Sequence, residues 1–182
     1  MKEKICLVTG VGPGTGSSMV KRFSKGGYRV LMLSRSKKRL SDLEKEVPNS
    51  KSFPCDVSQE KDMEKIIQKI KKEEGIPEVL VHNAVRGSRG NFLEIKPKDL
   101  LKNFEINTMG LLYLARGFSK EMVERGSGSI VVTGNTVIDA LLSVRSMITD
   151  DKELKTRLGT IFPMLDSKRR MILITGHRRE NF

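Results

Sequence analysis

Short apolar runs alternate along this chain with longer segments in which apolar residues recur at helical spacing. The runs at residues 5–8, 29–33, 51–55, 78–82 and 129–133 predict five buried strands. The segments between them predict helices, such as the one whose face is formed by Met63, Ile66, Ile67 and Ile70. Repeated alternation of strand and helix is typical of a parallel sheet with helices on both faces.

The longest apolar stripe lies in a helix predicted from about residue 107 to residue 125, after a helix whose first turn contains Pro97. The stripe consists of Leu111, Leu114, Ala115, Phe118 and Met122. Such a stripe packs either in the protein core or against another subunit of a homo-oligomer. We favour core packing and keep the subunit interface as the alternative.

Beyond residue 136, the pattern predicts two more helices and a sixth strand. The first helix has an apolar face that includes Val137 and Val144, the second begins near Asp150, and residues 171–175 form an apolar run. We expect residues 171–175 to pair in parallel with residues 129–133. Residues 1–182 are therefore predicted to form one α/β domain, a three-layer, Rossmann-like, doubly wound parallel sheet with strand order 3-2-1-4-5-6.

A glycine-rich stretch, Thr9-Gly10-Val11-Gly12-Pro13-Gly14-Thr15-Gly16, directly follows the first predicted strand and precedes a helix. Gly10 allows a tight turn, Gly14 lets the backbone approach a pyrophosphate, and Gly16 lets the helix pack closely on the strand. The helix N-terminus then offers free N–H groups to the pyrophosphate, next to Thr15. This context predicts a dinucleotide site; the alternative is an ordinary turn with flexible glycines.

The end of the second strand indicates which nicotinamide cofactor is preferred. A site for NAD carries an acid about 20 residues beyond the glycines, where it holds the ribose 2′-hydroxyl. This chain has Ser34 and Arg35 there, followed by the basic residues Lys37, Lys38 and Arg39. Arginine pairs well with a 2′-phosphate, so we predict that NADP(H) is favoured over NAD(H). The alternative is that these basic residues are only the solvated start of a helix.

Composition narrows the range of partners and locations. The 182 residues carry a formal net charge of +12, but basic and acidic residues are interspersed, and with no Trp and two Tyr there is no aromatic platform for bases. No run is long enough to cross a membrane, and the first apolar run stops at Gly10 without a cleavage site. We therefore expect a cytoplasmic protein that binds neither nucleic acid nor membranes. We also expect no metal site.

The two cysteines are expected to be free thiols. Cys6 lies on the first predicted strand and Cys55 on the third. Those strands are two spacings, roughly 10 Å, apart, which is too far for a disulfide bond.

Residues 1–136 resemble the short-chain dehydrogenase/reductase family. The resemblance is carried by the glycine loop and by the motifs Cys55-Asp56-Val57, Asn83-Ala84, Gly90-Asn91-Phe92, Asn107-Thr108-Met109-Gly110 and Gly128-Ser129-Ile130-Val131-Val132, in the family's order and spacing. The resemblance implies an oxidoreductase acting on a small carbonyl or alcohol. It also implies that Asp56 and Val57 flank the adenine and that Asn83 braces the fourth strand beside the cofactor, with Ala84 next to it. Asn107 matches the asparagine of the family's catalytic tetrad, whereas Val85 stands where the family usually has glycine.

The rest of that tetrad is missing. The family's hydride transfer uses a tyrosine as general acid or base, with a lysine four residues later. Tyr28 and Tyr113 are followed at that distance by Met32 and Gly117. The expected serine aligns with Asn135, which cannot relay a proton as a hydroxyl does. We therefore expect an NADP(H)-binding protein, chimeric or truncated, that is catalytically incomplete.

From about residue 133 the chain resembles UDP-N-acetylglucosamine 2-epimerase instead. The resemblance rests on residues 133–142 and on residues 171–181, which contain Thr175-Gly176-His177-Arg178-Arg179-Glu180. In that family the position of His177 lies in the active-site cleft. We infer a chimera in which residues 137–182 supply the last helices and strand. The alternative function is that of a nucleotide-sugar-binding fragment acting through His177, and a solvated basic tail is the plainer interpretation of these residues.

Overall fold

A computed structural model of the chain describes residues 3–88, 93–133, 153 and 156. Contacts divide the chain into two compact units, Met1–Thr133 and Gly134–Phe182. The architecture that follows is that of the first unit. The predicted single domain over residues 1–182 stays a prediction. The two helices and the sixth strand predicted after residue 136 fall in a part of the chain of which the structure describes only residues 153 and 156.

The described part of the chain contains one parallel sheet with strand order β3-β2-β1-β4-β5. Its strands are β1 (Ile5–Thr9), β2 (Arg29–Ser34), β3 (Ser50–Pro54), β4 (Val79–His82) and β5 (Ser129–Val132). Leu7 at the centre of β1 is in register with Leu31 of β2 and Leu80 of β4. The predicted α/β class is confirmed, and so is the predicted order of these strands.

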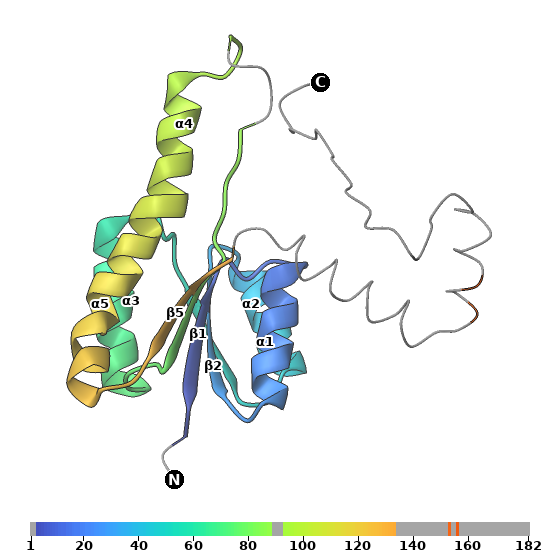
Figure 1. Cartoon of the computed structure of the whole chain (residues 1–182), viewed down its shortest axis with the longest axis vertical. Helices are drawn as coiled ribbons and strands as arrows, with labels where there is room; N and C mark the ends of the chain where they lie inside the picture. Colours follow the sequence, from blue (N-terminus) through green and yellow to red (C-terminus); the bar gives the residue numbers. More distant parts are fainter. Residues whose placement is uncertain (1–2, 89–92, 134–152, 154–155, 157–182) are drawn as a thin grey trace, which may run out of the picture. The chain divides into compact units, whose positions relative to one another are not determined.

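Helices cover both faces of this sheet (Figure 1). On one face lie α1 (Thr15–Lys25) and α2 (Lys37–Glu46); on the other lie α3 (Glu60–Glu73) and α5 (Gly110–Arg125). Successive strand residues point to opposite faces, so Leu7 packs with the α3 and α5 residues while Val8 packs with those of α1 and α2. Because both faces are covered, the central strands are apolar at nearly every position.

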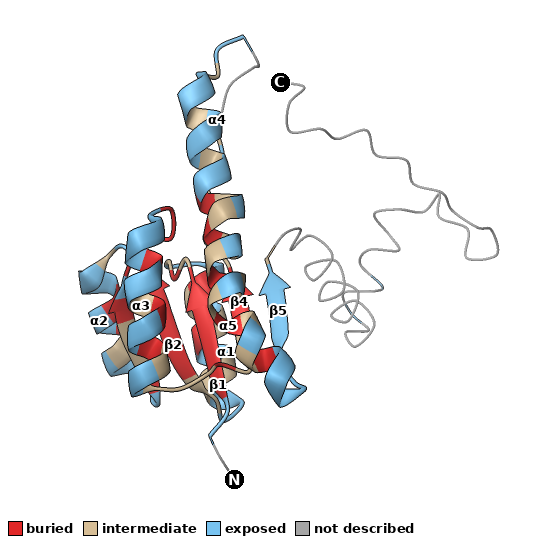
Figure 2. Cartoon of the chain, turned by 90° about the vertical axis from the view of Figure 1, so that its left-hand side faces the viewer, coloured by how far each residue is buried: buried red, intermediate tan, exposed pale blue. Residues whose placement is uncertain are grey.

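The long helix differs in one respect from the sequence prediction. Pro97–Phe104 (α4), the π-helical segment Glu105–Met109 (η1) and α5 follow one another without a break, where a helix at Pro97 and a separate one from about residue 107 were predicted. Phe104 and Gly110 have helical backbone angles, so nothing ends the helix between them. The packed end is α5, whereas α4 has no buried residue (Figure 2).

The apolar stripe of α5 packs mainly in the core, as predicted. Leu114, Phe118 and Met122 are buried in the cluster that α3 and the sheet complete, and Leu111 and Ala115 are half-buried. Gly126 ends the helix with a left-handed backbone (φ +70°). The described residues include no helix that is long and apolar enough to cross a membrane.

Both cysteines are buried and free, as predicted, although Cys55 directly follows β3 instead of lying within it. β3 ends at Pro54, whose partner Ser34 is the last residue of β2, so the paired ladder does not extend to Cys55. Burial raises the pKa of each thiol to about 12. Both side chains therefore remain protonated at neutral pH.

A buried histidine joins the sheet to the π-helical segment. His82, the last residue of β4, is 2% exposed, and its Nε2 lies 3.2 Å from the Ile106 carbonyl oxygen while its Nδ1 lies 3.1 Å from Thr9 Oγ1. A carbonyl oxygen can only accept, so Nε2–H donates to Ile106 and the neutral ring accepts from the Thr9 hydroxyl at Nδ1. Burial lowers the pKa of His82, partly opposed by its backbone partners.

Replacing Gly10 should destabilise the fold strongly. Gly10 has φ +66°, and a Cβ added there would lie 2.4 Å from the backbone of Ala84. Left-handed strain and overpacking together should cost Gly10→Ala roughly 2 to 5 kcal/mol of unfolding free energy. Gly12→Ala is the matched control in the same loop, since its Cβ would meet nothing nearer than 3.9 Å. Urea unfolding measures both; equal losses in the two variants would contradict this account.

His82 should make stability depend on pH. The pKa of His82 is lowered in the folded state from an ordinary value of 6.5. Below about pH 6.5, therefore, His82 binds a proton in the unfolded chain but stays largely neutral in the folded chain. The free energy of unfolding should therefore fall as the pH drops from 7.5 to 5.5. His82→Asn should be less stable at pH 7.5 and show a flatter pH dependence over this range. Parallel slopes for the two proteins in urea unfolding would contradict the assignment.

Candidate functional site

The glycine loop brings the N-terminus of α1 against the end of β1. The N–H of Val11 donates to the Leu33 carbonyl (3.2 Å), and that of Ser17 donates to the Gly12 carbonyl (3.1 Å). Gly16 allows the close packing, because a Cβ there would lie 2.7 Å from the Gly10 oxygen. The first turn of α1 contains no acidic residue, and no side chain caps the helix N-terminus, so no carboxylate of this turn opposes its partial positive charge. This arrangement suits an anionic ligand.

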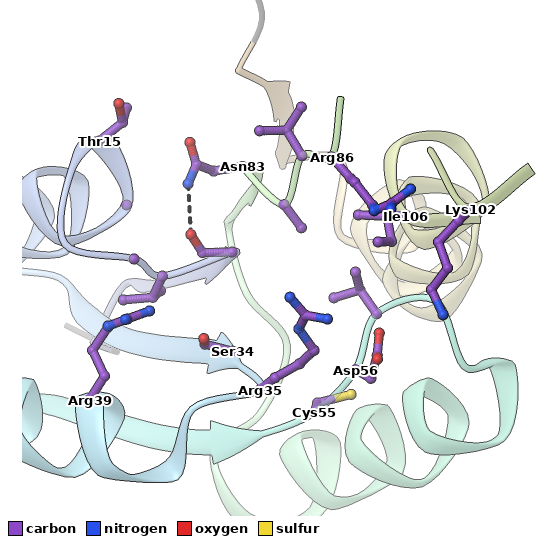
Figure 3. A pocket seen from close by; sticks show the side chains of 17 residues that line it. Thr15, Ser34, Arg35, Arg39, Cys55, Asp56, Asn83, Arg86, Lys102 and Ile106 are labelled. Atoms are coloured by element: carbon purple, nitrogen blue, oxygen red, sulfur yellow. Dashed lines mark hydrogen bonds between the residues drawn. The ribbon is translucent and has the colours of Figure 1, made fainter. Parts of the chain in front are cut away.

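A cleft of about 440 Å³ opens at the carboxyl ends of the strands, beside this loop (Figure 3). Nearly all the residues predicted to bind the cofactor line it: Gly10, Thr15, Gly16, Ser34, Arg35, Asp56, Val57, Asn83 and Ala84. Gly14 is the exception, because it is the exposed residue just before α1 and not part of the cleft wall. Val85 also lines the cleft, with 77% of its surface exposed.

Asn83 holds the strand ends together at the cleft floor. Its Nδ2 donates to the Gly10 carbonyl (2.9 Å), and its Oδ1 accepts from the Thr133 hydroxyl (3.0 Å). Its backbone N–H also donates to Thr9 Oγ1 (3.3 Å). The residue therefore connects the ends of β1 and β4 with the residue after β5.

The cleft wall is predominantly basic. Among the described residues, Arg35, Arg39, Arg86 and Lys102 line it, together with one carboxylate, that of Asp56. Sequence reasoning found Arg35 and its basic neighbours but missed Arg86 and Lys102. These two come from the segment after β4 and from α4, and no local spacing connects them with the glycine loop.

Asn107 does not line the cleft. Its Oδ1 accepts from the Arg86 N–H (2.8 Å) and its Nδ2 donates to the Arg86 carbonyl (2.9 Å). Both ends of the amide thus hold the backbone of the segment that follows β4. In this structure Asn107 positions one wall of the cleft.

The Arg86 side chain ties the same segment to α4. Its guanidinium donates to the Asp99 carbonyl oxygen (3.1 Å), to the Asp99 carboxylate (3.1 Å) and to Asn103 Oδ1 (3.0 Å). Asn103 in turn donates to Ser88 Oγ (2.8 Å). These bonds fix α4, which packs little of its own surface, beside the cleft.

The remaining candidate residues lie outside the described part of the chain. They are Asn135, His177 and the motif Gly90-Asn91-Phe92. Among the residues that are described, no cluster of three metal-ligating side chains occurs.

Comparison with known proteins identifies relatives that share this fold. The family model of the short chain dehydrogenases matches residues 4–139. A short-chain dehydrogenase from Streptomyces avermitilis is 30% identical with a TM-score of 0.69, over 72% of this chain and 48% of that one. A metagenomic short-chain oxidoreductase solved in complex with NADP is 25% identical with a TM-score of 0.68, over 71% of this chain and 61% of that one.

A second likeness covers a shorter stretch. UDP-N-acetylglucosamine 2-epimerase from Escherichia coli is 51% identical over 53 residues, which make up 29% of this chain and 14% of the epimerase. The chain thus spans about a seventh of that enzyme and about half to three-fifths of the two dehydrogenases. The family model, by contrast, matches most of the chain, and its residues include the glycine loop and the whole described sheet. The protein belongs to the short-chain dehydrogenase family.

Proposed function

We propose that the protein binds NADP(H) in the cleft beside the glycine loop, in preference to NAD(H). We also propose that it does so in the cytoplasm. The observation that carries the proposal is the position of Arg35, exposed at the end of β2 and lining the cleft together with Ser34 and the glycines. A guanidinium there can form a bidentate contact with a 2′-phosphate, and Arg39 adds positive charge beside it. The metagenomic relative, solved with NADP, supports the same choice.

In this proposal, each part of the cofactor is assigned to one part of the cleft. The N-terminus of α1 would take the pyrophosphate, Asp56 and Val57 would flank the adenine, and Asn83 and Ala84 would lie beneath the ribose nearer the nicotinamide. The bound cofactor would supply or accept a hydride. The chain's own residues would hold it and keep the segment after β4 in position through Asn107.

We further propose that the chain is catalytically incomplete. Tyr28 precedes β2, so it lies roughly 20 Å along the strand from the cleft, and its ring packs against Phe23 (5.3 Å between centroids). Tyr113 lies between α3 and α5 in a separate groove of about 230 Å³. Neither phenol can act as the acid or base for a small carbonyl or alcohol bound next to the cofactor.

The second candidate function is binding of a nucleotide sugar through the epimerase-like segment. The 51% identity over 53 residues favours it, and His177 would be its active residue. Titration with UDP-N-acetylglucosamine separates this candidate from the first. Binding that is lost in His177→Ala and kept in Arg35→Ala would establish it independently of the NADP site.

Cofactor preference should depend on Arg35. We expect NADPH to bind at least tenfold more tightly than NADH, a difference of about 1.4 kcal/mol. Arg35→Ala should remove most of that difference. Lys38→Ala is the matched control, because Lys38 belongs to the same basic cluster but pairs with Asp42 (3.2 Å) outside the cleft. Isothermal titration calorimetry measures the affinities of the three proteins for NADPH and NADH. Equal affinities of the unmodified protein for the two cofactors would refute the preference.

Turnover should be absent or close to background. The missing acid–base pair should lower the rate by about 10²–10⁴-fold relative to complete members of the family. The absorbance of NADPH or NADP⁺ reports turnover across a panel of aldehydes, ketones and alcohols. Robust turnover that disappears in Asn107→Ala would show that the site works without the tyrosine and lysine.

A further inference from the structure

The buried imidazole of His82 contacts the long helix at two points. Its Nε2–H donates to the Ile106 carbonyl (3.2 Å), and a Cβ added at Gly110 would lie 3.2 Å from His82 Cε1. Ile106 lies inside the π-helical segment, and Gly110 is the first residue of α5. The ring therefore packs against the turn at which α4 passes into α5. Its other partner, Thr9, ends β1, so the ring joins this turn to the sheet.

The π-helical turn determines how α4 is oriented relative to α5. The Gly110 N–H donates to the carbonyl of Glu105, five residues earlier, so this turn holds one residue more than an α-helical turn. One residue corresponds to about 100° of rotation around a helix axis. If the turn closed to α-helical geometry, the whole of α4 would therefore rotate by about that angle.

The face of the helix that this turn orients is the one that binds Arg86. Asp99, Asn103 and Asn107 follow one another at intervals of four residues, the spacing that places side chains on one face of a helix. The first two bind the Arg86 guanidinium, and the Asn107 amide binds the N–H and the carbonyl of Arg86. Arg86 lines the cleft. A change in the turn would thus move this face away from the cleft wall.

We propose that His82 is a positioning residue of the cleft. By donating to the Ile106 carbonyl, it keeps the turn in its π-helical form, and the turn keeps Asn107 and α4 directed toward Arg86. Both His82 and Ile106 are buried, and a buried carbonyl that loses its donor is costly, so the turn is held against the imidazole. His82 does not line the cleft and acts through these partners. The inference rests on the proposed binding of NADP(H), which is the property that the cleft wall serves.

Ligand binding tests this role with two substitutions of similar size. His82→Leu removes both hydrogen bonds of the ring, whereas His82→Gln keeps an amide N–H close to the position of Nε2. In isothermal titration calorimetry, His82→Leu should weaken NADPH binding about tenfold and His82→Gln less than about threefold. Ile70→Ala is the matched control, because Ile70 is also buried but lies in α3; it should lower stability and leave the NADPH affinity unchanged.

Hydrogen exchange tests the same role without any ligand. The Arg86 N–H donates to Asn107 Oδ1 (2.8 Å), so its rate of exchange reports whether that contact is kept. The exchange should be about tenfold faster in His82→Leu than in the unmodified protein and should be slow again in His82→Gln. Ile70→Ala, which loses stability at a distance from the turn, should leave the exchange at Arg86 unchanged.

Two results would overturn the inference. His82→Leu could match the unmodified protein in NADPH affinity and in exchange at Arg86, or His82→Gln could be impaired as much as His82→Leu, which would assign His82 to core packing alone. Failure of the proposed function would look different: the unmodified protein would not bind NADPH, while exchange at Arg86 would still respond to His82→Leu. Circular dichroism checks folding; if His82→Leu does not fold, His82→Val, which also lacks both bonds, replaces it with the same expected losses.

Discussion

The site depends on the close contact between the ends of β1 and β4. Gly10 turns the chain with a left-handed backbone directly against Asn83 and Ala84, leaving no space for a side chain. The Asn83 amide then bonds the Gly10 carbonyl, so the turn and the neighbouring strand end stabilise each other. Because the turn also aims α1, this contact determines where the helix N-terminus, the floor of the cleft and the residues after β4 lie.

A second set of hydrogen bonds connects the ends of β1 and β4 to α4. The Thr9 hydroxyl accepts from Asn83 and donates to His82, and His82 donates to the Ile106 carbonyl in the π-helical segment. One residue later, Asn107 holds the backbone of Arg86, whose side chain holds α4. The π-helical segment thus has a structural role, because the Ile106 carbonyl within it accepts a hydrogen bond from the buried His82 imidazole.

Prediction from sequence succeeded where the signal was local. The alternation of apolar runs predicted β1 to β5, and the glycine loop with Arg35 predicted most of the cleft. It failed where a residue acts through partners distant in the chain. Arg86 binds Asp99 and Asn103 because the segment after β4 runs beside α4, and the spacing of these residues in the sequence does not predict that contact. Gly14 fits the sequence motif but does not line the cleft, whereas Gly12 and Gly16 do.

The two buried cysteines give the molecule a practical property. Because their pKa values are raised to about 12, Cys6 and Cys55 are almost entirely protonated at neutral pH. The thiolate, and not the thiol, is the form that reacts with maleimides and oxidants. The chain contains no other cysteine. A thiol introduced at an exposed position beside the cleft would therefore react with a fluorescent label against a silent background. Ligand entry could then be followed by emission in the otherwise unaltered protein, without first replacing any native cysteine.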